Sequence, residues 1–250
     1  FYSSSDWSIK IFNNYNYGLE ISENLFFSDN VQLLNLILRP FKLLTKLDFQ
    51  YISLWYLICV TLQGYFSFKI IHHYTKNEIY SFIASILFII LPFFLDRLFI
   101  HISLAAHWLI LWAIYLQMKY MPEKSLKKWS FLISLSFFIN INISIMVVLY
   151  FYLHLTFLFI IKQIKLKQLI FLYTYFLILI IISLFFCGFF TISFFNMPDF
   201  GYGIYKSNLL SLLDSGGGIL TANWSNLFFD FNNIPGEQEG FSFLGLTFYI

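Results

Sequence analysis

The segment 92–112, PFFLDRLFIHISLAAHWLILW, carries the side chains of this chain that are best suited to chemistry. Arg97 and His101 lie four residues apart, so a helix would place both on one face. Arginine binds phosphate through its forked guanidinium, and histidine donates hydrogen bonds or transfers protons near neutral pH. We therefore predict that Arg97 and His101 bind a phosphate group. The alternative is that Arg97 extends to lipid headgroups and that His101 makes its hydrogen bonds inside a bundle of helices. Ala105, Trp108 and Trp112 would lie on the same helix face, so that the five residues form one predicted stripe.

Three acidic residues are candidates for a catalytic role, namely Asp29, Asp96 and Glu239. Asp29 precedes an amphipathic segment that would hold it at the membrane surface. A carboxylate there could act as a base, or bind a divalent cation beside a lipid phosphate. The alternative role for Asp29 is the N-cap of the following helix. Asp96 could equally belong to a plain turn. Glu237 and Glu239 could line the outer cavity that Arg97 and His101 would face.

Two amides, Asn140 and Asn142, interrupt an apolar stretch at 129–161. Backbone at a bend inside a membrane must be buried in protein or line a wet cavity. We predict that Asn140 and Asn142 line such a cavity, and the alternative is that they only satisfy the bend. His107 and His154 are interpreted as packing residues.

Metal and cofactor motifs are absent from the sequence. It contains no HExxH motif, no Gly-rich phosphate loop after a strand and no GxSxG motif. Cys59 and Cys187 lie in apolar runs and are expected to be core residues. No protein metal site is predicted, and a divalent cation at Asp29 is the one cofactor that remains open.

Composition places these residues in a membrane protein. The chain is 59% hydrophobic and 11% charged, whereas soluble domains have about 25% charged residues. A formal net charge of +2 argues against a nucleic-acid partner. Apolar runs at 51–68, 79–95, 98–118 and 168–195 predict membrane-spanning helices, so the predicted fold class is an all-α polytopic transmembrane bundle.

Charge decides how the stretch at 129–161 folds, because it is long for one span and short for two. A helical hairpin with its tip near residues 140–144 puts nine lysines and two glutamates on one side of the membrane. The other side then carries six basic and eleven acidic residues. Basic residues concentrate in cytoplasmic loops, so we predict a short hairpin entered from the cytoplasm, with the acidic loops on the outer face.

The regions outside the bundle are predicted to lie on that outer face. Residues 31–47 have apolar residues at helical spacing, with Arg39, Lys42 and Lys46 on the polar side, which is typical of an interfacial helix. We expect an outer loop at 1–50 that contains this helix, a transmembrane bundle at 51–195 and an outer loop at 196–240. A further span is expected to start at 241–250, with both ends of the chain truncated.

Short motifs spread along the chain resemble a family of uncharacterised bacterial inner-membrane proteins, a domain-of-unknown-function group similar to the GT-C superfamily of lipid-dependent glycosyltransferases. The resemblance covers nearly the whole chain in order. Its motifs are Tyr17-Gly18-Leu19-Glu20, Phe27-Ser28-Asp29, Phe49-Gln50-Tyr51, Leu62-Gln63-Gly64-Tyr65-Phe66, Arg97 with His101, Ala106-His107-Trp108-Leu109-Ile110-Leu111, Gly201-Tyr202-Gly203-Ile204-Tyr205, Asn208-Leu209-Leu210-Ser211-Leu212 and Glu239-Gly240-Phe241.

The resemblance implies a GT-C-like body in the bacterial inner membrane, with juxtamembrane helices in its outer first loop and an acidic residue that faces a lipid-linked sugar. Two departures stand against it. The family usually continues Asp29 with Ser and a Pro two positions later, whereas this chain has Asn30, Val31 and Gln32. The acidic residue that acts as base in GT-C enzymes normally follows a first span, which would lie upstream of Phe1.

The expected function is transfer of a sugar from a polyprenyl-phosphate donor to a cell-envelope acceptor at the outer face. Membrane lipid and a polyprenyl-phosphate-linked sugar are then the expected partners. The alternatives are a transporter or flippase of lipid-linked saccharides that performs no chemistry, or a membrane scaffold.

Overall fold

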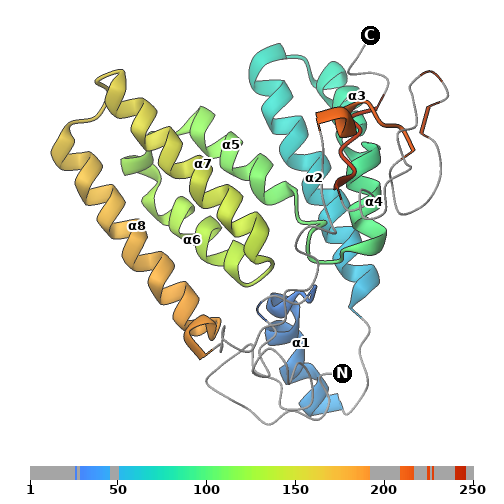
Figure 1. Ribbon diagram of the computed structural model, residues 1–250, viewed down its shortest axis with the longest axis horizontal. Coiled ribbons are helices and arrows are strands. Elements are labelled where there is room, and N and C mark those ends of the chain that lie inside the picture. Colours follow the sequence, from blue (N-terminus) through green and yellow to red (C-terminus); the bar gives the residue numbers. More distant parts are fainter. Residues whose placement is uncertain are drawn as a thin grey trace.

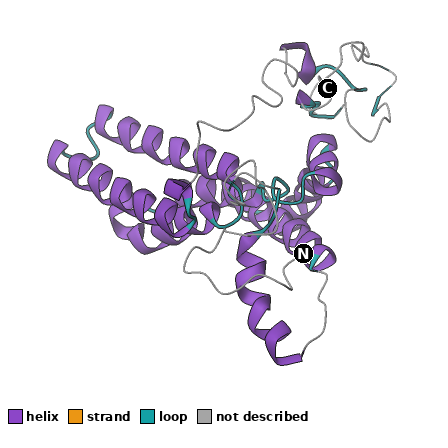
Figure 2. Ribbon diagram, turned by 60° about the horizontal axis from the view of Figure 1, so that its bottom comes forward, coloured by secondary structure: helices purple, strands orange, loops and turns teal. Residues whose placement is uncertain are grey.

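The computed structural model describes residues 26, 29–45, 51–191, 209–216, 224–225, 227 and 240–245. These residues form eight α-helices and short 3-10 turns, with no strand among them (Figures 1 and 2). Three helices are long and apolar enough to cross a membrane: α2 (Ile52–Thr75), α7 (Ile141–Ile160) and α8 (Leu166–Phe186). The prediction of an all-helical fold with helices that could span a membrane is therefore confirmed.

α2 and the next helix form a tight antiparallel pair. α2 ends at Lys76, which adopts the left-handed conformation at φ 55°, and Asn77 caps α3 (Glu78–Ile89) by accepting a hydrogen bond from the Tyr80 N–H at 2.9 Å. Farther along the pair, Gly64 lets the helices approach closely. A Cβ at this position would lie 2.9 Å from Ile89 Cδ1.

The predicted span at 79–95 is not one straight helix. α3 and α4 (Pro92–Ile100) meet at an angle of 52°, and the pair counts as a fourth span only if both halves are taken together. Pro92 explains the break, because proline has no N–H for the helical ladder and is favoured in the first turn of a new helix.

The prediction of a continuous helix at 98–118 is wrong. α4 ends at Ile100, α5 (Trp108–Lys119) begins eight residues later, and the connection 101–107 is not helical. Tertiary hydrogen bonds hold this connection, including one from Trp55 Nε1 to the Ile102 carbonyl at 2.6 Å. The predicted stripe is therefore divided between two helices, with Arg97 on α4 and Trp108 on α5.

The predicted helical hairpin is present, but only one of its arms is short: α6 (Leu126–Phe137) has 12 residues, whereas α7 has 20 and is long enough to cross a membrane. A 3-10 turn (Pro122–Ser125) leads into α6, the chain reverses at residues 138–140, and α7 returns. Its tip thus lies at the start of the predicted range 140–144. α6 is about 18 Å long at 1.5 Å per residue, which is short for a hydrocarbon core of about 30 Å.

An aromatic core joins the hairpin to α8. Trp129, Phe151 and Phe176 come from α6, α7 and α8 and are fully buried, with ring centroids 4.6 and 4.3 Å apart. Phe66 of α2 stacks on Trp108 and Trp112 of α5 in a second aromatic contact. These contacts fix where the helix ends lie, and the helix ends carry the candidate site.

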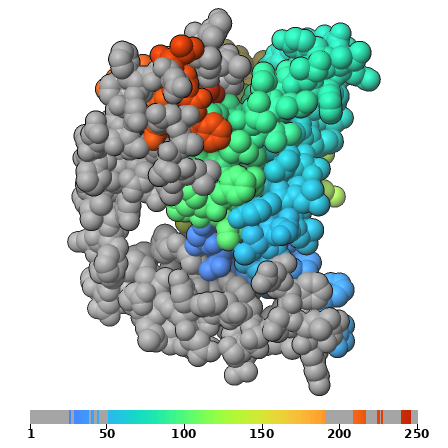
Figure 3. All heavy atoms as spheres, turned by 90° about the vertical axis from the view of Figure 1, so that its right-hand side faces the viewer, coloured from blue at the N-terminus to red at the C-terminus, as the bar shows by residue number. Residues whose placement is uncertain are grey.

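The connections of the bundle lie at two opposite ends. Those at 76–77, 120–125 and 161–165 lie toward the upper side in Figure 1, and they carry four lysines, namely Lys76, Lys124, Lys162 and Lys165. The connection 101–107, the hairpin tip and α1 (Gln32–Thr45) lie toward the lower end. Described C-terminal residues lie beside the green part of the chain in Figure 3, and a Cβ on Gly245 would be 3.4 Å from Cδ of Pro92, the first residue of α4.

Candidate functional site

Asp29 is bound by the non-helical connection between α4 and α5. Its Oδ1 accepts hydrogen bonds from the Ser103 backbone N–H at 2.8 Å and from Ser103 Oγ at 2.5 Å. The two residues are 74 positions apart in the sequence. A carboxylate held by two donors from one residue has a fixed position, so Asp29 is oriented by tertiary structure although it lies outside any helix.

Asn140 extends this network from the hairpin tip. Its Oδ1 accepts from the backbone N–H groups of Asn142 and Ile143 at 2.8 and 3.3 Å, which caps α7. Its Nδ2 donates to Ser103 Oγ at 2.8 Å. Because Ser103 Oγ accepts this bond, its own proton is available for Asp29, and the three side chains form a directed chain of donors.

The other oxygen of Asp29 faces His101. His101 Nδ1 lies 3.6 Å from Asp29 Oδ2, and the side chains are 25% and 36% exposed, respectively. This separation is too long for a direct hydrogen bond, although the two groups attract when His101 is protonated. Oδ2 therefore keeps the capacity to accept a further hydrogen bond, on a side chain that is partly exposed.

Tyr51, at the start of α2, forms another wall of the site. Burial raises the pKa of its phenol, a hydrogen bond with the Asn35 side chain opposes this shift, and the Asp29 charge adds to it. Tyr51 therefore remains protonated at neutral pH. The neighbouring Trp55, which holds the Ile102 carbonyl, fixes the connection between His101 and Ser103.

The segment around Asp29 is also tied to the hairpin and to α8. The Leu33 N–H in the first turn of α1 donates to the Phe138 carbonyl at 2.9 Å. The ring of Phe26 packs edge-on against Phe189 at 5.4 Å. Asp29 Oδ1 accepts hydrogen bonds from Ser103, and α1 begins only at Gln32, so the interpretation of Asp29 as a simple N-cap of α1 does not hold.

The structure separates the other predicted site residues from this network. Asp96 is fully buried within α4, unlike the half-exposed Asp29. Arg97 is partly buried and interacts electrostatically with His107, whose ring packs beside Phe93 and Phe94 at 5.5 and 5.7 Å.

Two further sets of predicted residues remain. Asn142 has an exposed side chain and joins the site only through its backbone N–H. Glu237 and Glu239 lie outside the described residues. Of the eight predicted site residues, the structure thus brings Asp29, His101 and Asn140 together.

Ser103 is the central residue that sequence analysis missed. On a continuous helix, His101 and Ser103 would point in different directions. In the turns that follow Ile100, both side chains instead reach Asp29. Their spacing therefore becomes informative only once the helix is known to end at Ile100. A polar residue between His101 and His107 in an apolar run was the available signal.

The site has the parts for acid–base chemistry and few ligands for a metal. Among the described residues, no group of three or more His, Cys, Asp or Glu side chains is arranged to hold a metal ion. Asp29 and His101 offer one oxygen and one nitrogen on the same side of the site. A divalent cation at Asp29 stays a prediction that would need further oxygens from a ligand.

Comparisons with known proteins point to a family without an assigned function. No curated protein and no solved structure matches the chain. The resemblance to an uncharacterised domain-of-unknown-function family is confirmed. The model of the domain of unknown function DUF6311 matches residues 1–250, and the chain therefore belongs to this family.

Proposed function

We propose that this protein is a membrane-embedded glycosyltransferase with a GT-C-like body, which transfers a sugar from a polyprenyl phosphate to an acceptor hydroxyl. The observation that carries the proposal is the positioning of Asp29 by Ser103 and Asn140, with Oδ2 open beside His101. A fixed and partly exposed carboxylate at one end of an apolar bundle is suited to take a proton from a hydroxyl group.

The proposed step balances as a single displacement. Asp29 Oδ2 accepts the proton of the acceptor hydroxyl, and the acceptor oxygen bonds to the anomeric carbon of the sugar. The bond between that carbon and the phosphate oxygen breaks, and its electron pair leaves with the polyprenyl phosphate. His101, beside Asp29 Oδ2, would balance the charge of this leaving group, and Arg97, on the last turn of α4 and outside the Asp29 network, would take part if the phosphate extends to it.

The proposal includes an orientation in a bacterial inner membrane. The end of the bundle that carries Asp29 would face outward, because the lysines of the connections at 120–125 and 161–165 lie at the other end. An exposed apolar stripe on α1, formed by Ile37, Phe41 and Leu44, supports an interfacial position for this helix beside the site.

The test uses purified full-length protein in lipid nanodiscs, with a panel of polyprenyl-phosphate hexoses and pentoses as donors. Asp29→Asn should lower turnover by about 100-fold or more, because general-base catalysis contributes at least this much. Glu123→Gln, which neutralises an exposed carboxylate at the opposite end, should leave turnover unchanged.

Two results would overturn the proposal. One is the absence of turnover with every donor, together with unchanged donor binding in Arg97→Ala. The other is movement of the lipid-linked sugar across liposomes at the same rate in the wild type and in Asp29→Asn, which would favour a flippase.

A further inference from the structure

The connection between α5 and α6 concentrates positive charge at the end of the bundle opposite the hairpin tip (Figure 1). Residues 119–128 contain one acidic residue, Glu123, and four lysines, namely Lys119, Lys124, Lys127 and Lys128. All five side chains are exposed, and none of them forms an ion pair with the described part of the chain. The segment therefore carries a net positive charge that attracts an anion from outside the chain.

Two of these lysines converge on one aromatic ring. Lys128 Nζ lies 3.5 Å and Lys119 Nζ lies 5.7 Å from the centroid of the Tyr120 ring. Lys119 Nζ also donates a hydrogen bond to the Tyr115 hydroxyl at 3.0 Å. Because both ammonium groups lie close to the same ring, they are no more than about 9 Å apart, and cation–π contacts hold them there against their mutual repulsion. An anion that contacts both ammonium groups would offset this repulsion.

The packing of α6 on α7 shows how deep these lysines lie. Trp129 of α6 contacts Phe151 of α7, with ring centroids 4.6 Å apart, and Lys128 immediately precedes Trp129. From Phe151, α7 continues for nine residues to Ile160, whereas α6 begins only three residues before Trp129. At about 1.5 Å per residue, Lys128 thus lies about 12 Å short of the end of α7 along the helix axis. Since α7 is long enough to cross a membrane, the backbone of Lys128 lies at the depth of lipid and not in the water beyond it.

This depth decides what kind of anion reaches the segment. An ammonium group within a bilayer is costly unless it extends to the head groups or pairs with an anion. The last turns of α7 beside it carry exposed apolar side chains, Phe157 and Ile160, which are suited to lipid. A soluble acidic protein would dock beyond the end of α7, whereas the phosphate of a lipid is the anion that lies close enough to meet Lys128.

The face of α6 that carries Lys127 and Lys128 continues as an apolar surface. Phe131 lies four and three residues after these lysines, so it is on the same face of the helix, and it is 58% exposed. Its ring packs edge-on against Trp112 of α5 at 5.9 Å. Charge at the start of the helix and an exposed aromatic surface one turn deeper match the phosphate and the acyl chains of a phospholipid.

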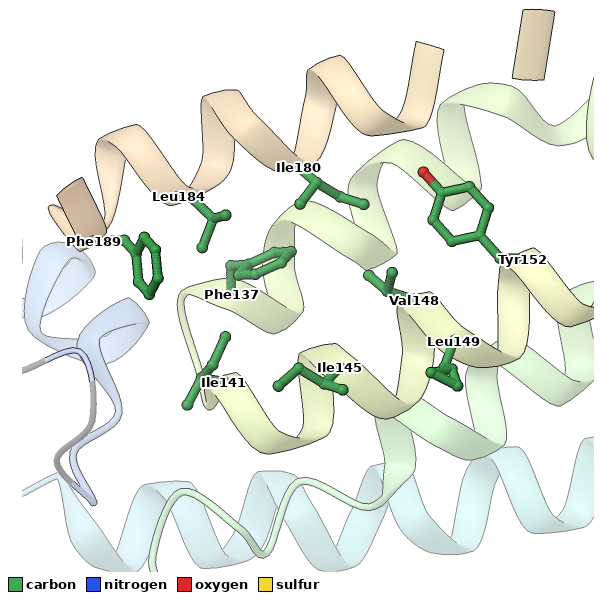
Figure 4. Close-up of a pocket in the computed structure, with 9 residues that line it drawn as sticks. All are labelled: Phe137, Ile141, Ile145, Val148, Leu149, Tyr152, Ile180, Leu184 and Phe189. Atoms are coloured by element: carbon green, nitrogen blue, oxygen red, sulfur yellow. The ribbon is translucent and has the colours of Figure 1, made fainter. Parts of the chain in front are cut away.

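The pocket between α7 and α8 lacks this combination of features. The side chains that line it are apolar except for Tyr152, whose hydroxyl is the one oxygen atom drawn among them (Figure 4). None of these lining residues is charged, so the pocket offers no cation to a phosphate. The cations that a lipid head group needs lie instead in the segment 119–128.

We propose that Lys119, Tyr120 and Lys128 bind the phosphate of an anionic phospholipid of the bilayer, at the end of the protein opposite the Asp29 site. The two lysines contact oxygens of one phosphate, and the Tyr120 ring holds both lysines in position. Phosphatidylglycerol has no cation in its head group, whereas the choline of phosphatidylcholine is repelled by the lysines. The phospholipid is a structural ligand and not a substrate, so the proposal does not depend on sugar transfer.

Native mass spectrometry of the purified full-length protein tests the proposal with dioleoyl phosphatidylglycerol and dioleoyl phosphatidylcholine, which share their acyl chains. The wild type should bind the first molecule of phosphatidylglycerol about tenfold more tightly, because charge-assisted hydrogen bonds form only with the head group that keeps its negative charge. Equal binding of the two lipids would overturn the proposal. Inorganic phosphate should not displace the bound lipid, and displacement would reveal a site for soluble anions and contradict the lipid assignment.

Charge-matched variants separate this site from the general positive charge of the same end. Lys119→Gln with Lys128→Gln should weaken phosphatidylglycerol binding about tenfold, and Lys119→Arg with Lys128→Arg should retain it, because arginine keeps the charge and the contact with the ring. Lys124→Gln with Lys167→Gln is the control, since both lysines are exposed and make no cation–π contact in the described part of the chain. Equal weakening in the control pair would show that only total charge matters and would reject the site. The comparison of the two lipids on the wild type is independent of how each variant folds.

Discussion

Asn140 Nδ2 donates a hydrogen bond to Ser103 Oγ over 2.8 Å, and this contact joins the hairpin tip to the broken connection between α4 and α5. The same amide caps α7 through its Oδ1. One side chain thus caps the start of α7 and orients the donor that holds Asp29. An amide is required for both tasks, because it offers an acceptor and donors on one group.

Asn140→Asp separates these two tasks. Aspartate can still cap α7, so the melting temperature in detergent should change little. It replaces a donor to Ser103 Oγ by a second carboxylate near Asp29, so turnover of a polyprenyl-phosphate sugar should fall at least tenfold. Asn77 caps α3 in the same way far from the site, and Asn77→Asp is the matched control for both measurements. Unchanged turnover in Asn140→Asp contradicts this role.

Ser103→Ala removes the hydroxyl between Asn140 and Asp29 and keeps the backbone donor. An unsatisfied buried polar group costs about 1–3 kcal/mol, so the free energy of unfolding should fall by this amount. Ser53→Ala, on an exposed position of α2, should have no such effect. A double-mutant cycle with Asp29→Asn should be clearly non-additive, and strict additivity would show that the two side chains act separately.

Periodicity and charge predicted the parts of the fold that local sequence determines. Apolar spacing indicated a helix at 31–47, where α1 is found, and the lysine distribution favoured the hairpin that α6 and α7 form. Residues 101–107 are apolar enough to continue a helix, but in the structure they form turns that are held by long-range hydrogen bonds from Trp55 and to Asp29. The role of Ser103 depends on a partner 74 residues away, which one sequence does not reveal.

The proposed orientation of the bundle predicts which loops are accessible from each side of the membrane. After replacement of Cys59 and Cys187 by alanine, single cysteines at Lys165 and Lys124 should react with a membrane-impermeant maleimide only from the cytoplasmic side. A cysteine at Asn142, which is exposed beside the hairpin tip, should react only from the outer side. Outer labelling at Lys165 would contradict the orientation and leave the helical fold unchanged.

The close approach of α2 and α3 at Gly64 should limit which side chains are accepted there. Gly64→Leu must displace Ile89, because even a Cβ would lie 2.9 Å from Ile89 Cδ1, and overpacking of this kind costs about 1–3 kcal/mol. Adding Ile89→Ala should recover part of the loss by making space. Thr61→Leu, at an exposed position on α2, is the control. Equal thermal stability of the Gly64→Leu and Thr61→Leu variants would contradict the close approach of α2 and α3 at Gly64.

The hydrogen bond from Trp55 to Ile102 should determine the shape of the connection that carries His101 and Ser103. Trp55→Phe leaves the Ile102 carbonyl without its 2.6 Å donor, so both stability and turnover should fall. Trp129→Phe provides a matched comparison, because Trp129 is equally buried and its Nε1 has no hydrogen-bond partner among the described residues. Both substitutions remove the same volume, so the difference between their melting temperatures reports the hydrogen bond. If Trp55→Phe retains turnover while Trp129→Phe loses it, core packing and not this bond maintains the geometry around Asp29.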